Sequence, residues 1–328
     1  MNALPVPDAL GRVHPPARPG SRIVSLVPSL TELLFALELG PQVVGRTGFC
    51  IHPADAVRAV PKLGGTKDVD VEALRQLAPT HVLLNIDENE QPLFEQLERF
   101  VPHVIVTHPI EVEDNFALYA LLGGLFDRRT QAEALAAALR DELLACARAS
   151  WRWRRVLYLI WRNPWMTVGQ QTYIARMLAQ VRLSAVAPPG DDRYPTLELP
   201  GFGPDGFDAV LLSSEPYRFG VRHVDELAAQ PWLDHRPVLL IDGEMTSWYG
   251  ARAIAGLRYL RAYRDRDWAS VRRAKEQFWA DDHAARGPLA GLRAGAALWE
   301  HARAVDPSWP DEAQRAEDLA HHIELAEK

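Results

Sequence analysis

The sequence predicts an α/β protein with two lobes, each built on a parallel sheet, joined by one long α-helix and followed by a helical C-terminal extension. Three observations lead to this prediction. Short β-rich runs alternate with helical segments. This alternation stops at one long amphipathic segment and then restarts. It ends before residue 265, after which tryptophans recur at helical spacing. We expect a disordered leader at 1–20, an N-terminal lobe at 21–128, a connecting helix at 129–150, a C-terminal lobe at 151–264 and a helical extension at 265–328.

The N-terminal lobe opens with a β-rich run at 22–27 that leads into an apolar helix. Ser29 or Thr31 can cap this helix, because a side-chain oxygen there accepts an unpaired backbone N–H. Gly40-Pro41 ends it. Further strands are predicted at 43–45, 81–86 and 103–107, with helices near 71–78 and 92–99.

The connecting helix and the C-terminal lobe follow from the same patterns. The helix carries one apolar stripe, formed by Leu135, Ala138, Leu139, Leu143, Leu144 and Ala147. Strands are then predicted at 155–161, 208–214 and 237–241. Residues 77–84 and 207–212 are similar, and each of these strands runs into an acidic loop, so the two lobes share one plan.

Composition excludes several classes of function. The 36 Lys+Arg and 43 Asp+Glu residues give a net charge of −7 without a basic run, which argues against nucleic-acid binding. Cys50 and Cys146 are the two cysteines, so no disulfide framework is predicted. The leader lacks the apolar segment of a secretory signal. We expect a cytoplasmic monomer, or a periplasmic one if a longer precursor exists.

Candidate site residues in the N-terminal lobe lie in loops after predicted strands. Cys50 and His52 are two residues apart in an extended segment, which puts both side chains on one side. A thiolate and an imidazole suit a soft or borderline metal, and His52 is the candidate metal contact. A buried free cysteine beside a loop histidine is the alternative. Lys67 sits on a Gly-rich turn, either as a ligand contact or as a solvated cation, and Glu88 belongs to an acidic loop.

Aromatic residues follow three predicted strands of the C-terminal lobe. Ligands of open α/β sheets bind beyond the carboxyl ends of the strands, so these positions favour a binding site. Stacking rings with a nearby arginine suit a flat, partly anionic ligand. The candidates are Trp161, Trp165, Tyr217, Arg218, Trp248 and Tyr249.

The segments RIVSLVPSLTELLFALELG, VGRT and DVDVEALRQLAPTHVLL resemble class III periplasmic substrate-binding proteins, the receptors for cobalamin and ferric siderophores that feed ABC importers. FCIHP, GGTK, IDENE, SSEPY and IDGEMTSWYGAR resemble a cobalamin-receptor-like branch. The resemblance spans about residues 21–264. It implies two Rossmann-like lobes, a ligand cleft between them, and a glutamate on each lobe that docks onto an ABC permease. Glu72 matches the first docking position, and Glu244 lies three residues from the second, at Ser247.

These observations predict a non-enzymatic binding protein without a covalent cofactor. Its ligand is a small-molecule metal chelate or corrinoid, cobalamin-like or ferric siderophore-like, held in the interlobe cleft. An alternative is a cytoplasmic enzyme or metallocofactor-handling protein on the same fold, in which Cys50, His52 and Glu88 do the chemistry. A third possibility is an interaction module whose C-terminal extension recruits a partner.

Overall fold

The structure is a computed structural model that describes residues 6–199, 206–234 and 236–266. The first sheet is parallel, with strand order β2-β1-β3-β4. Its strands are buried, as in parallel sheets that helices cover on both faces. They are β1 (Ile23–Ser25), β2 (Val43–Arg46), β3 (His81–Asn85) and β4 (His103–Thr107). The helices of this lobe are α1 (Pro28–Ala36), α2 (Ala54–Val57), α3 (Val71–Gln76), α4 (Gln91–Leu97) and α5 (Asp114–Leu125), with a 3₁₀ turn at Gly40–Gln42.

The start of α1 differs from the sequence prediction. Val27 is the N-cap and Pro28 opens the helix, and no side chain caps it. The hydroxyl of Thr31 instead donates back to the carbonyl of Val27, at 3.0 Å. Proline suits the first helical position because its fixed φ is helical and its missing N–H would be unpaired there. By contrast, Asp70 caps α3 by accepting the N–H of Ala73 at 2.9 Å.

The second sheet is centred on the long strand β5 (Arg154–Trp161) and has the order β10-β9-β5-β6-β8, with β7 also paired to β5. The other strands are β6 (Trp165–Thr167), β7 (Leu183–Ala185), β8 (Thr196–Leu197), β9 (Ala209–Ser213) and β10 (Val238–Ile241). The helices are α7 (Tyr173–Gln180), α8 (Val221–Ala228), α9 (Gly243–Ser247) and α10 (Arg252–Arg264), with a 3₁₀ turn at Pro231–Leu233.

The two sheets share a parallel core and differ at one edge. The parallel order β7-β5-β9-β10 repeats the order β2-β1-β3-β4, so the two lobes share one plan, as the internal similarity of the sequence predicts. The strands β6 and β8 are antiparallel additions, so the second sheet is mixed and not purely parallel. The turn at 162–164 is too short for a crossover, so β6 has to run antiparallel to β5.

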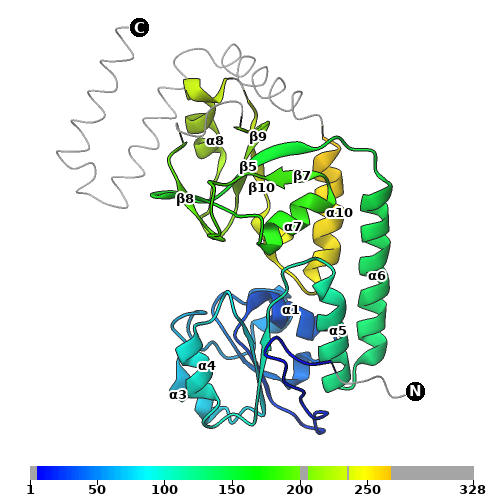
Figure 1. The fold of residues 1–328 in the computed structure, drawn as a ribbon. Helices are drawn as coiled ribbons and strands as arrows, with labels where there is room; N and C mark the ends of the chain where they lie inside the picture. Colours follow the sequence, from blue (N-terminus) through cyan, green and yellow to red (C-terminus); the bar gives the residue numbers. More distant parts are fainter. Residues whose placement is uncertain (1–5, 200–205, 235, 267–328) are drawn as a thin grey trace, which may run out of the picture. The chain divides into compact units, whose positions relative to one another are not determined.

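The connecting helix α6 (Arg129–Arg148) lies alongside α5 and also contacts α7 and α10 of the second lobe (Figure 1). Leu139 and Cys146 are buried on it, whereas Leu144 is 47% exposed, so the buried stripe is narrower than predicted. Glu142 accepts hydrogen bonds from Arg258 and Arg261 of α10, each at 2.8 Å. Charge pairing as well as apolar packing thus attaches α6 to the second lobe.

The leader at residues 6–20 is ordered, which corrects the prediction of disorder for this part. We call it the N-terminal strap. Its Asp8 is buried and accepts the N–H groups of Leu10 and Arg12, each at 2.9 Å. Ala9 donates to the carbonyl of Val106 at 2.8 Å, so the strap hydrogen-bonds to β4, the edge strand of the first sheet. Covering an edge in this way blocks pairing with another chain, and composition alone does not reveal it.

The predicted helical extension from residue 267 onward lies outside the described residues. Helix α10 ends at Arg264. Among the helices of the described ranges, none combines the length and the apolar character that a membrane span requires.

Candidate functional site

The segments that follow the strands of the two sheets come together in one region of the structure. Side-chain pairs that join them include Glu32 with Arg252, His52 with Glu244, Glu88 with Tyr249, and Asp87 with Arg193. The first member of each pair comes from the first lobe and the second member from the second lobe. The carboxyl ends of the two sheets therefore face each other, which is where open α/β sheets bind ligands.

Arg252, at the start of α10, is the centre of the largest group of these contacts. Its guanidinium donates two hydrogen bonds to Glu32, both at 2.7 Å, and a third to Glu244 at 2.9 Å. Burial lowers the pKa of Arg252, but the carboxylates of Glu32 and Glu244 raise it by more, so the net shift of the pKa is upward. The guanidinium also lies 4.8 Å from the centre of the Trp248 ring. A planar donor fork is suited to such bidentate pairing.

His52 reaches the same group from the first lobe. Its Nε2 lies 2.9 Å from Oε2 of Glu244, and its ring meets that of Trp248 edge-on, with the ring centres 5.5 Å apart. The side chain stays 31% exposed. His52 is therefore both part of the interlobe contact and accessible to a ligand.

Two further carboxylates of this region are held by neutral donors. Glu215 accepts hydrogen bonds from Ser247 at 2.7 Å and from the indole of Trp248 at 2.8 Å. Burial raises the pKa of Glu215, and these hydrogen bonds oppose the rise. Glu88 accepts a hydrogen bond from the hydroxyl of Tyr249 at 3.3 Å, and burial raises its pKa to about 7. The folded environment thus favours the protonated form of Glu88 more than an exposed position would.

An aromatic cluster lies at the ends of β5, β6 and β9. Trp161 and Tyr217 meet edge-on at 5.7 Å between ring centres, and Tyr217 lies 4.6 Å from Phe219. Phe219 in turn stacks on Trp165 at 6.0 Å with nearly parallel planes. Trp161 is 39% exposed. The structure therefore brings together three residues that the sequence nominated, and adds the buried Phe219.

Other nominated residues of the second lobe lie elsewhere. Trp248 and Tyr249 are buried, with 8% and 6% exposure, and belong to the interlobe contacts instead of the aromatic cluster. Arg218 is exposed. Arg162, which the sequence analysis did not select, lies 5.7 Å from the ring centre of Trp165.

The side chains of Cys50 and His52 contact different residues. Cys50 is fully buried, and its Sγ contacts the hydroxyls of Thr31 and Thr47 at 3.0 and 3.1 Å. Burial raises the pKa of this thiol, which disfavours the thiolate that nucleophilic catalysis or metal binding requires. Its surroundings match the alternative given above, a buried free cysteine beside a loop histidine.

Lys67 and Glu72 are solvent-exposed residues of the first lobe. The turn that carries Lys67 is held by Asn89, whose amide donates to the carbonyl of Thr66 at 3.0 Å. Glu72 lies on α3 with a side chain that is 72% exposed. Glu244, the other expected docking residue, is 23% exposed and already engaged by Arg252 and His52.

Several residues of this site were missed at the level of sequence. Arg252, Glu32 and Glu215 are far apart along the chain, so no spacing pattern connects them. Arg252 and Glu215 do fall within the quoted segments IDGEMTSWYGAR and SSEPY, which was the available signal. Among the described residues, no group of three or more His, Cys, Asp or Glu side chains is arranged to hold a metal ion.

Comparisons with known proteins agree with this architecture. A sequence profile described as "Periplasmic binding protein" matches residues 23–198. The periplasmic vitamin B12 binding protein BtuF of Vibrio cholerae is 15% identical with a TM-score of 0.63, and the match covers 75% of this chain and 98% of that chain. No curated protein sequence matches.

Two further solved structures show the same fold. The periplasmic heme-binding protein RhuT from Roseiflexus sp. RS-1 is 24% identical with a TM-score of 0.63, over 75% of this chain and 98% of that one. A possible iron-binding periplasmic solute-binding protein from Staphylococcus epidermidis is 18% identical with a TM-score of 0.62, over 74% and 97%. The predicted fold, two α/β lobes of the class III binding proteins, is confirmed.

Proposed function

Because the chain belongs to the periplasmic binding protein family, we propose that it binds a metal chelate or corrinoid where the two lobes meet. The family consists of substrate-binding proteins and not of enzymes, which agrees with the prediction of non-enzymatic binding. Cobalamin-like and ferric siderophore-like ligands are the two proposed classes. Heme is a third member of the same chemistry, since solved relatives of this fold include heme-binding proteins.

The aromatic cluster is the observation that supports this proposal most directly. Trp161 exposes a large ring at the carboxyl end of β5, next to Tyr217 and Trp165. Rings offered at the end of a sheet bind flat or apolar faces by stacking and by removing apolar surface from water. Arg162 adds a cation beside these rings for the anionic groups of a chelate, since its guanidinium lies 5.7 Å from the ring centre of Trp165 while it also pairs with Glu226. Arg218 and Lys67, both exposed, are the other cations proposed for this role.

The described side chains also suit a metal that arrives already chelated. A free metal ion needs several protein ligands, and the described residues offer no such group. A chelated metal needs at most one or two additional ligands. His52 can supply one, provided that its Nε2 leaves Glu244.

The first test identifies the ligand class. Native mass spectrometry and an absorbance spectrum are recorded on protein purified from its own source. The expected result is a bound mass that carries cobalt or iron, together with visible absorbance. A bare protein that remains bare when cyanocobalamin, a ferric siderophore and hemin are added would refute the proposal.

The second test locates the site by comparing variants near the carboxyl end of β5 with a variant at its amino end. Trp161→Ala and Trp165→Ala should weaken binding of the identified ligand about tenfold or more, because each removes a stacking face. Trp153→Ala is the matched control, since Trp153 precedes β5 at its amino end and is 61% exposed. Trp248→Ala should also weaken binding, through loss of the hydrogen bond to Glu215. Unchanged affinity in the Trp161 and Trp165 variants would exclude the aromatic cluster from the site.

We also propose that the loaded protein docks onto an ABC permease through Glu72. The carboxylate of Glu72 is exposed and makes only a long contact, 3.7 Å, with Arg75. Glu72→Gln should weaken permease binding in a pull-down assay while leaving ligand affinity unchanged. The predicted cytoplasmic location is tested by fractionating cells that express the natural gene.

A further inference from the structure

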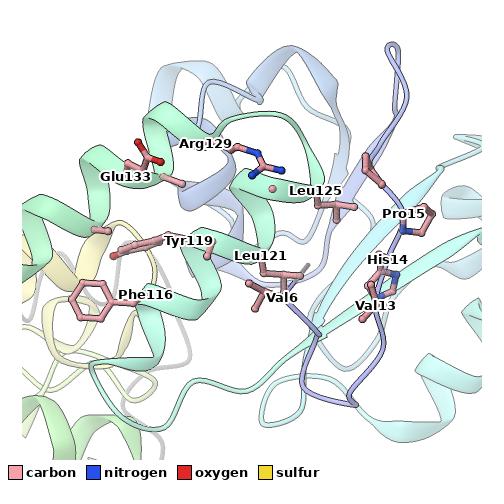
Figure 2. A pocket seen from close by; sticks show the side chains of 15 residues that line it. Val6, Val13, His14, Pro15, Phe116, Tyr119, Leu121, Leu125, Arg129 and Glu133 are labelled. Carbon is pink, nitrogen blue, oxygen red and sulfur yellow. The ribbon is translucent and has the colours of Figure 1, made fainter. Parts of the chain in front are cut away.

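A pocket lies between the N-terminal strap and the helices α5 and α6 (Figure 2). Its volume is about 630 Å³, which is within the range of small-molecule sites. Its lining residues are distinct from the aromatic cluster, and one of them, Tyr119, also joins the lobes, because its hydroxyl donates to the carbonyl of Gly250 at 2.9 Å. Figure 2 shows Leu121 and Leu125 of α5 pointing toward the strap that carries Val13.

The walls of this pocket are anchored on each side. At Gly123 the helices approach closely, because a Cβ there would lie 2.5 Å from that of Ala132. The strap is attached to α5 through the N–H of Ala17, which donates to the carbonyl of Leu125 at 2.7 Å. His14, which lines the pocket, is held by Asp8 at 3.0 Å. Since both helices and strap are fixed in place, the pocket is preformed.

Most of the lining is apolar, and part of it is open to solvent. Val13, which lines the pocket on the strap side, is 57% exposed. Gly124 borders free space, because a Cβ built on it meets nothing within 4 Å. The pocket, of about 630 Å³, has room for far more than a single water molecule. An apolar chain of about a dozen carbons would fill much of it and would bury Val13.

One end of the pocket carries a cation. Arg129 lines the pocket at the first residue of α6 and is exposed. The first turn of α6 contains no acidic residue. Glu133 follows one turn later. The lining is thus mainly apolar, with the cation Arg129 where α6 begins and the carboxylate of Glu133 one turn further along.

We propose that this pocket binds an amphiphile with a single apolar chain and a carboxylate head. The chain lies against Leu121, Leu125 and Val13, and the carboxylate pairs with Arg129. This site is separate from the proposed chelate site, so neither proposal depends on the other.

Isothermal titration with dodecanoate, kept below its micelle concentration, tests the proposal on the full chain. The expected result is saturable binding of one molecule per chain. Dodecanol and dodecyltrimethylammonium should bind more weakly, because they lack the carboxylate. Arg129→Gln should weaken dodecanoate binding about two- to fivefold, as expected for an exposed ion pair. Glu133→Gln should not weaken it. Equal binding of the three amphiphiles would overturn the head-group assignment.

Two variants test the location. Gly124→Phe fills the free space and should reduce dodecanoate affinity about tenfold or more. Val13→Asp places a negative charge on the strap wall and should also reduce dodecanoate affinity. The change should leave folding intact, since Val13 is exposed. Ala134→Leu, at an exposed position of α6 outside the lining, is the control and should bind normally.

Three outcomes would overturn the proposal. The first is absence of saturable dodecanoate binding to the unmodified protein. The second is undiminished binding by both Gly124→Phe and Val13→Asp. The third is self-association of the unmodified chain that Gly124→Phe abolishes, which would assign the pocket to a second copy of the protein.

Discussion

His81, the first residue of β3, should make the folded protein sensitive to mild acid. Its ring is 3% exposed, stacks on His103 at 4.9 Å between ring centres, and meets Phe126 edge-on at 5.0 Å. Nδ1 lies 2.8 Å from the hydroxyl of Thr80, and in the described part of the chain Nε2 has no partner. Burial, followed by the like charges of His103 and His14, lowers the pKa of His81 to about 4.

The sign and size of the effect follow from proton linkage. In the unfolded chain His81 takes up a proton near its ordinary pKa of 6.5, whereas in the folded protein it does so only near pH 4. Between these values the unfolded state binds more protons, so the free energy of unfolding falls as the pH falls. For this single group the loss between pH 7 and pH 5 is about 2 kcal/mol, as an upper bound.

Urea denaturation of the protein and of His81→Phe at pH 7 and pH 5 measures this loss. Phenylalanine keeps a ring in the stack but does not titrate, so the variant should lose up to about 2 kcal/mol less between the two pH values. Val104→Ala, a change of a buried residue of β4 that does not titrate, is the control and should lower stability equally at both pH values. An unchanged pH dependence in His81→Phe would refute the linkage argument.

Three other predictions concern groups of the interlobe region and the cysteines. The folded state raises the pKa of Glu88 to about 7, so the contribution of this group to the free energy of unfolding is lost as the pH rises from about 4.5 to 7. In urea denaturation, the free energy of unfolding of Glu88→Gln relative to that of the natural protein should therefore be higher at pH 8 than at pH 5. Cys50 and Cys146 are buried with raised pKa values, so iodoacetamide should alkylate both slowly at pH 7.5 and rapidly in denaturant, and fast native labelling of Cys50 would contradict its burial. Arg252→Ala leaves the partly buried carboxylate of Glu32 without this partner and removes one of the two partners of Glu244, so it should cost about 2 kcal/mol of unfolding free energy. Arg58→Ala, which breaks a long surface contact, should change the denaturation curve little.

Much of the fold could be predicted because it depends on local periodicity. The strand β4 was predicted at its observed residues, and the helix at 129–150 was predicted within two residues of its end. Alternation of strands and helices implies parallel crossovers, and the similarity of the halves predicted two lobes of one plan, although not their strand order or the strand β7. These features require only neighbouring residues, so one sequence contains enough information to find them.

The aromatic cluster was partly predictable for the same reason. Trp161 ends β5, Trp165 lies just beyond it at the start of β6, and Tyr217 follows β9, and parallel strands end at one edge of a sheet. The strap was not predictable, because its order depends on Asp8, a residue whose role is visible only beside β4. Composition alone made the strap resemble a disordered leader.

The sequence by itself determined the order of the secondary structure, the two-lobe plan and the kinds of side chains at the strand ends. Only the tertiary structure decided that Arg252 joins Glu32 to Glu244, that Cys50 lies in the core, and that a pocket remains between the strap and α6. These contacts join residues far apart in the chain, and no local propensity encodes such pairs. The packing of the two sheets and the helices brings these distant residues together, and a charge that packing removes from water is stable only when it has a partner there.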